Sequence, residues 1–126
     1  MLRAKVLPEV LGQIVGDGID ATMLMTLDGA LMGSVGDANV VDHKVVGAIA
    51  SHTWGEYAHS SKEVNAGHEL QTLLVELENG RLAMSAAGKG FLVCAYSSGD
   101  AEPGFLKAKV EALGAFLSTS LDQINV

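Results

Sequence analysis

Two histidines and a glutamate in one short segment have a spacing that could hold a metal. His52 and Glu56 are four residues apart and His59 follows three residues later, so a helix would present all three on one face. Imidazole and carboxylate are both zinc ligands. The two histidines would nevertheless lie about 10 Å apart along the helix axis, whereas zinc–ligand bonds are about 2 Å long. We therefore expect no metal site, although about one bound zinc or iron per chain would revive a metal-assisted enzyme.

Other reactive residue types lack the setting that chemistry needs. The run GKG at 88–90 does not match a phosphate-binding loop, because Ala83 and Gly90 occupy positions where that loop needs a glycine and a Ser or Thr. Cys94 lies in the apolar run FLVCAY without a charged neighbour that would activate it. No Gly-x-Ser-x-Gly motif is present. The sequence predicts no cofactor site and no catalytic residue.

Helices are predicted at both ends of the chain and in its middle. Residues 2–15 and 104–124 carry apolar side chains at helical spacing, and a third such segment runs over 37–60 with Asp37 as its N-cap. Pro8 is compatible only with a first turn, so the first helix begins close to it or bends there.

A first β-hairpin is predicted over 20–35. Its centre is Asp28-Gly29, a dipeptide that readily adopts the positive φ angles of a two-residue type I′ turn. Such a turn places Met25 opposite Met32. Both strands are largely apolar on both sides, which is typical of strands covered on each face.

A second hairpin is predicted over 70–87 around Asn79-Gly80, the strongest short hairpin signal. The register of a two-residue turn at this dipeptide places Glu78 opposite Arg81. This would form a favourable cross-strand charge pair.

The remaining segments complete an α+β domain over 1–126. Residues 61–69 are polar and form a connecting loop, while the apolar run GFLVCAYS supplies a fifth strand. The order of elements is α-β-β-α-β-β-β-α. Tight turns imply a five-stranded antiparallel sheet, and three helices suffice to cover both of its faces.

The charge balance excludes several classes of partner. Eight Lys and Arg against fifteen Asp and Glu give a formal net charge of −7, so no nucleic acid is expected as a ligand. No apolar run approaches the roughly 20 residues of a membrane-spanning helix. Neither a secretion signal nor a lipidation motif is evident, so we expect a cytosolic protein without direct membrane insertion.

Small residues recur at every fourth position of the middle helix. Gly47, Ser51 and Gly55 follow this spacing beside Trp54, the only tryptophan of the chain. Because a glycine inside a helix costs about 1 kcal/mol relative to alanine, this strip needs a reason outside the helix. It could let another chain's backbone approach closely with the tryptophan as an anchor. The alternative is close packing of this helix on its own sheet.

The chain resembles the roadblock family, the dynein light chain roadblock-like domains, over nearly its whole length. The resemblance lies in the order of elements and in the segments TMLMTLDGALMG, VVGAIASHTWGEYA, LLVELENGRLAMSAAGKGFLVCAY and GFLKAKVEAL. Within the family, MLRAKVL, AIAS before Trp54, and FLKAKVEAL are most similar to the roadblock-type subunits of the Ragulator adaptor complex. Pro8 departs from the family's uninterrupted first helix.

This resemblance implies how the domain is built and how it pairs. The middle helix is expected on one face of the sheet and the terminal helices on the other. Family members pair through the middle helix and the third strand, here 38–60 and 70–78, to form one continuous sheet. The partner-interface residues that follow are Val46, Gly47, Ala50, Ser51, Trp54, Gly55, Leu70, Thr72, Leu74 and Glu76.

The resemblance also implies a non-catalytic scaffold. A Ragulator-type subunit pairs with a second roadblock-domain protein and is held by a lipidated anchoring subunit. It helps to dock Rag-type small GTPases and a MAP kinase and TOR signalling module on the cytosolic face of late endosomes or lysosomes. An isolated chain is expected to form a homodimer. The alternatives are a dynein light chain or a homodimeric small-GTPase regulator within the family, and a ligand-binding domain with an apolar pocket outside it.

Overall fold

The structure, a computed structural model, describes residues 7–36, 42–64, 72–78, 80–88, 90–99 and 101–124, and their side chains except those of 60–64 and 120–124. Five strands form one antiparallel sheet in the order β2-β1-β5-β4-β3. The elements confirm the predicted α+β order, and they are α1 (Leu7–Gly12), β1 (Ala21–Thr26), β2 (Leu31–Gly36), α2 (His43–Val64), β3 (Thr72–Leu77), β4 (Gly80–Ala86), β5 (Phe91–Ser97) and α3 (Pro103–Ile124).

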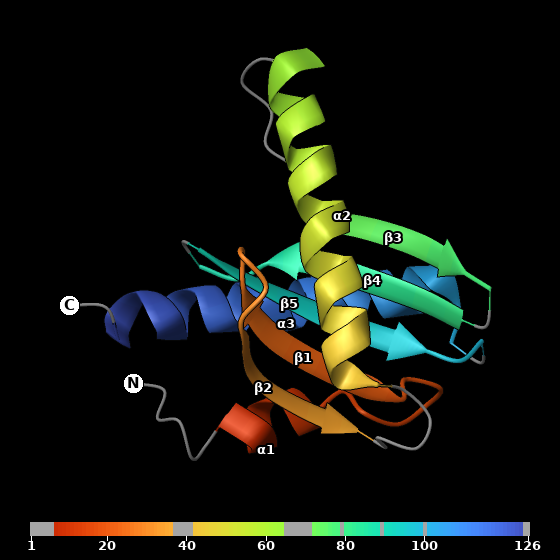
Figure 1. The fold of residues 1–126 in the computed structure, drawn as a ribbon. Coiled ribbons are helices and arrows are strands. Elements are labelled where there is room, and N and C mark those ends of the chain that lie inside the picture. Colours follow the sequence, from red (N-terminus) through yellow and green to blue (C-terminus); the bar gives the residue numbers. More distant parts are fainter. Residues whose placement is uncertain are drawn as a thin grey trace.

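Helices cover both faces of the sheet, as Figure 1 shows: α2 lies on one face, and α1 and α3 lie on the other. Each face therefore has its own apolar core, which explains why the central strands are apolar on both sides. The core under α2 contains Val46, Ala50 and Trp54 together with methionines of β1 and β4. The opposite core receives Leu11 from α1 and four side chains from α3, namely Leu106, Val110, Leu113 and Leu117.

The described part of α1 begins at Leu7, so Pro8 occupies the first turn, where its missing N–H is harmless. The helix ends at Gly12, earlier than predicted. The reason is the turn that follows, in which Gly16 pairs with Ile19 and Asp17 adopts a φ of 52°. Residues 2–6 of the predicted helix lie outside the described residues.

The start and end of α2 differ from the prediction. Asp42 caps the helix, because its carboxylate Oδ1 accepts the backbone N–H groups of Lys44 at 3.0 Å and Val45 at 3.3 Å. The predicted cap Asp37 lies outside the described residues. The helix continues to Val64, so the first residues of the predicted loop over 61–69 are helical.

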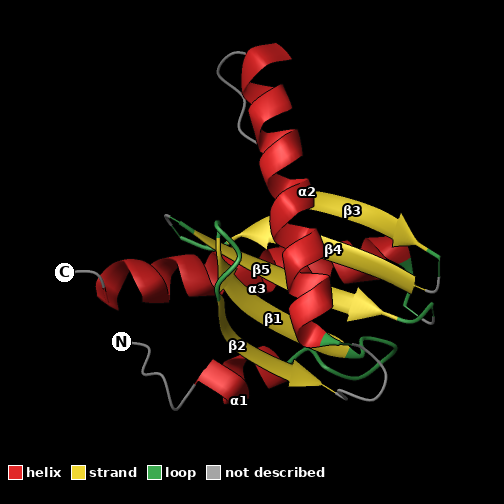
Figure 2. Ribbon diagram, viewed as in Figure 1, coloured by secondary structure: helices red, strands yellow, loops and turns green. Residues whose placement is uncertain are grey.

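The first hairpin has a three-residue loop, and the predicted two-residue turn is wrong. The Gly29 N–H donates to the Thr26 carbonyl at 3.0 Å, and only Gly29 in this loop has a positive φ, 101°. A type I turn followed by such a glycine adds one residue to the loop. As a result Met25 lies opposite Leu31 and not Met32. Figure 2 shows the strands of this sheet in yellow and the loop of the first hairpin in green.

The second hairpin forms, but in a register different from the predicted one. Arg81 lies opposite Glu76 and not Glu78. Gly80 belongs to β4 and has no positive φ. A glycine is needed there for another reason: a Cβ would lie 2.4 Å from a β5 carbonyl oxygen. Asn79 lies outside the described residues. A shift of two residues leaves each side chain on its predicted face, so the apolar pattern alone could not decide the register.

Candidate partner interface

The three residues with metal-binding spacing lie on the solvent side of α2. His52 Nε2 is 3.8 Å from Glu56 Oε1, and both side chains are exposed. They line an open hollow with Ser51, Gly55 and His59. Among the residues that the structure describes, no three His, Cys, Asp or Glu side chains gather as metal ligands. This arrangement suits a polar contact surface better than a reaction centre.

Cys94 and the glycine-rich turn show no features of reactive groups. Cys94 is fully buried in β5, and this burial raises the pKa of its thiol far above the ordinary value, so the thiolate is disfavoured. Gly88 and Gly90 have φ angles of 67° and 93° and form the turn between β4 and β5. Lys89, between them, lies outside the described residues.

The strip of small residues on α2 divides into two parts. A Cβ on Gly47 would lie 3.4 Å from Met25 Cε, and the Ser51 hydroxyl donates to the Leu27 carbonyl at 2.9 Å. These two positions therefore let α2 pack closely against the β1–β2 hairpin of its own chain. Gly55 differs, because a Cβ there would meet nothing within 4 Å. Only Gly55 leaves a gap that faces outward.

Three further predicted interface residues of α2 lie in the chain's own core. Val46, Ala50 and Trp54 are buried against the sheet. The structure thus accounts for these side chains through packing within one chain. Their part in a partner contact stays a prediction.

β3 is an edge strand, because among the described strands it pairs only with β4. The predicted interface residues alternate with those that face α2. Thr72 donates to Glu111 of α3 at 2.8 Å and Leu74 packs on the α3-side core. The other side chains, Leu73, Val75 and Leu77, are only half-buried beneath the α2 side of the sheet. Leu70 lies outside the described residues.

Figure 1 shows that α2 crosses the sheet and continues beyond β3. Tyr57 follows Val46 by about three helical turns, so the two side chains point to the same side of the helix. Val46 is 7% exposed and Tyr57 is 56% exposed. Tyr57 is therefore an exposed aromatic side chain on the side of α2 that carries Val46, although its neighbour Ala58 still packs against the core under α2.

The sequence prediction missed Tyr57. Its position seven residues after Ala50 and eleven after Val46 was a usable signal, since both intervals are close to whole helical turns.

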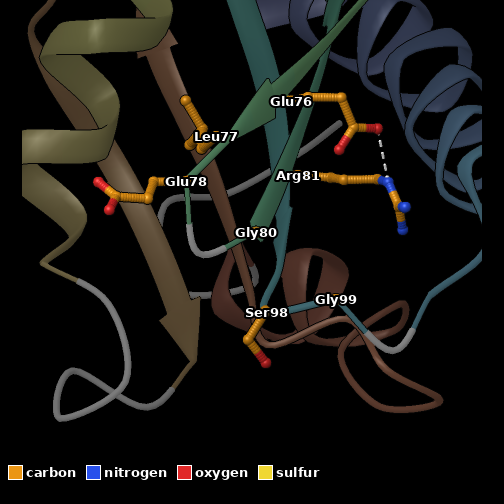
Figure 3. A pocket seen from close by; sticks show the side chains of 7 residues that line it. All are labelled: Glu76, Leu77, Glu78, Gly80, Arg81, Ser98 and Gly99. Carbon is orange, nitrogen blue, oxygen red and sulfur yellow. Dashed lines mark hydrogen bonds and ion pairs between the residues drawn. The ribbon is translucent and has the colours of Figure 1, made fainter.

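A polar hollow lies where β3 ends, as Figure 3 shows. Arg81 is its only cation among the lining residues; its Nε is 2.6 Å from Glu76 Oε1, and a second nitrogen donates to the Ala101 carbonyl at 2.9 Å. Glu78 points away from this pair in the figure. The arginine is thus held by partners of its own chain, where it links β3, β4 and the segment before α3. The lining residues of this hollow include no reactive group.

The described residues thus form an edge strand and a helix that extends beyond it, and they do not assemble a metal-ligand cluster. The model of the Roadblock/LC7 domain matches residues 12–97. The chain belongs to the Roadblock/LC7 family. This finding confirms the family that the sequence segments resemble.

Several proteins are similar to this roadblock chain in sequence. The Caenorhabditis elegans "Ragulator complex protein LAMTOR2 homolog" is 28% identical over 126 residues, which cover 99% of this chain and 97% of that protein. The uncharacterized protein MJ0714 of Methanocaldococcus jannaschii is 36% identical over 77 residues, 61% of this chain and 64% of its own.

Solved structures share the fold of this roadblock chain. Myxococcus xanthus MglB has a TM-score of 0.82 at 13% identity and covers 98% of this chain and 94% of its own. A Roadblock/LC7 domain from Streptomyces avermitilis has a TM-score of 0.73 at 18% identity, with 90% and 92% covered. At these identities the likeness concerns the fold alone. Within the described residues, no helix has the length and apolar character to cross a membrane.

Proposed function

We propose that this roadblock chain is a non-catalytic adaptor subunit that pairs with a second roadblock-domain chain through β3 and the overhanging half of α2. The observation that carries the proposal is Tyr57, an aromatic side chain that lies on the same side of α2 as Val46 and is 56% exposed, on a helix that extends beyond β3. A second sheet that continues from β3 would lie beneath it.

The edge of β3 supports the same arrangement. Its backbone has a neighbour on one side only, and an unpaired, largely apolar edge is costly to leave exposed. Antiparallel pairing with a partner strand would satisfy these backbone groups over Thr72, Leu74 and Glu76. It would also cover the half-buried Val75 and its neighbours on the α2 side.

Gly55 supports close approach of a partner helix. Its outward gap is bordered by Ser51, His52 and Glu56, so a second helix could rest there without displacing a side chain. Of the small strip predicted from sequence, the part that we assign to the partner interface is therefore Gly55.

The full-length similarity to a LAMTOR2 homolog supports a Ragulator-like adaptor. In this role the partner is a different roadblock chain, a lipidated subunit supplies the membrane anchor, and the platform docks Rag-type GTPases and a MAP kinase and TOR signalling module on late endosomes or lysosomes. The isolated chain forms a homodimer through the same edge. The second candidate, a homodimeric small-GTPase regulator or a dynein light chain, is an alternative within the same Roadblock/LC7 family.

The deciding experiment is a mass-spectrometric census of the proteins that co-purify with the tagged chain from its native cells. A second roadblock chain, a lipidated small subunit and Rag-like GTPases would support the late-endosomal adaptor. Dynein intermediate chains would support the second candidate. A monomer without any partner, in cells and at high concentration in solution, would overturn pairing itself.

A further inference from the structure

We propose that the outward flank of α3 docks an amphipathic helix of a different chain, one that carries a carboxylate opposite Lys109. This surface is separate from the pairing surface, since α3 and α2 lie on opposite faces of the sheet (Figure 1). Its central observation is a pair of exposed aromatic side chains, Phe105 at 36% and Phe116 at 52%.

The two phenylalanines lie on one line along the helix. Phe116 follows Phe105 by about three turns, and Lys109 and Ala112 lie between them on the same flank. The core-facing residues Leu106, Val110, Leu113 and Leu117 have the same spacing, displaced by one residue. Helix α3 thus has a second seam with the i, i+4, i+7, i+11 spacing by which one helix packs against another. If this flank of α3 faced only solvent, polar residues would be expected along it.

The charge of the seam selects the partner. Lys109 Nζ lies 5.3 Å from the centre of the Phe105 ring, and no carboxylate in the described part of the chain pairs with it. Lys107, on the other flank of α3, does have a carboxylate partner, Glu111 Oε1 at 3.6 Å. The seam is therefore apolar with one uncompensated cation, in a chain whose net charge is −7. A partner helix with an acidic residue would complement it.

A second copy of this chain fits less well. In a parallel pair of α3 helices Lys109 would face its own copy, and in an antiparallel pair that joins Phe105 to Phe116 the two lysines would lie within about one turn of each other. Like charges at that separation oppose association. The occupant that the seam favours is thus a different chain.

The test compares the native assembly, purified through a tag, with the recombinant chain. Hydroxyl-radical oxidation should be several-fold slower at Phe105 and Phe116 in the native assembly, because both rings are covered. Zero-length carbodiimide cross-linking should join Lys109 to an Asp or Glu of another protein. Equal oxidation rates in both samples, or a cross-link only to a second copy of this chain, would overturn the proposal.

Variants separate this surface from the pairing surface. Phe116→Ser should lose the docked chain, and Lys109→Glu should reduce its retention roughly tenfold, whereas Lys109→Arg should retain it. Met32→Ser is the matched control, because Met32 is 53% exposed on β2. The roadblock pair itself should survive all four changes by light scattering. Full retention of the docked chain by both Phe116→Ser and Lys109→Glu would contradict the proposal, even where pairing is intact.

Discussion

Val46 and Tyr57 point to the same side of α2, yet the sheet covers Val46 and leaves Tyr57 in solvent. One side of α2 thus carries a core residue at Val46 and an exposed aromatic residue three turns later. β3 is the last described strand on this side of the sheet, and α2 continues beyond it. Burial of a large apolar side chain contributes about 1.5–3 kcal/mol, so a partner sheet that extends under Tyr57 has a clear energetic gain.

Tyr57→Ser should weaken pairing by at least about thirtyfold, because loss of a buried aromatic anchor costs about 2 kcal/mol or more. The single chain should keep its thermal stability, since Tyr57 is exposed in it. Sedimentation equilibrium over a range of concentrations measures the pairing constant. Phe116→Ser, on the opposite face, serves as the control, and equal pairing of the two variants would remove Tyr57 from the interface.

Gly55→Leu should abolish pairing and leave the monomer folded. A Cβ at this position meets nothing within 4 Å in this chain, and the gain in helix propensity should raise the monomer's stability by about 1 kcal/mol. Gly47→Leu should instead destabilise the monomer by about 1–3 kcal/mol, because it would press on Met25. Chemical denaturation and light scattering distinguish the two. A dimer mass that Gly55→Leu does not change would exclude the gap at Gly55 as a contact.

Gly80→Ala should destabilise the second hairpin, because its Cβ would lie 2.4 Å from the Ser97 carbonyl oxygen. That oxygen belongs to the backbone and cannot move without disturbing the β4–β5 pairing. A loss of about 2 kcal/mol or more in the free energy of unfolding is expected. Gly55→Ala, at an open position, is the matched control and should be neutral or stabilising. If both alanine variants unfold at the same denaturant concentration, the close approach at Gly80 is not a constraint.

The turn of the first hairpin should contribute to pH dependence. The pKa of Asp28 is lowered, chiefly because the Thr26 hydroxyl donates a hydrogen bond to its carboxylate. A lowered folded-state pKa stabilises the fold above the ordinary value of 3.8 and loses this contribution as the pH falls through the folded-state pKa. Thr26→Val should return the pKa of Asp28 toward its ordinary value in an NMR titration. An unchanged titration curve would show that another group holds the carboxylate.

Local signals were sufficient for the elements and the architecture. Hydrophobic periodicity predicted all three helices, and Asp28-Gly29 and Asn79-Gly80 marked both hairpins, because the preferences involved act over a few neighbouring residues. These local signals could not predict the strand registers of the two hairpins. Arg81 pairs with Glu76, and Gly80 lies close to the Ser97 carbonyl of β5, a contact between residues distant in sequence that no local signal reports.

For the candidate interface, too, the sequence indicated some features and the tertiary structure decided others. The residue types of α2 indicated a helix made for close packing, but not which side each small residue faces. Gly47 and Ser51 turned out to serve the chain's own β1–β2 hairpin, while Gly55 faces outward. The spacing of Tyr57 from Val46 was visible in the sequence, but its exposure was not. Periodicity reports the side of a helix that is apolar, whereas the position of the last strand decides how much of that side one chain can cover.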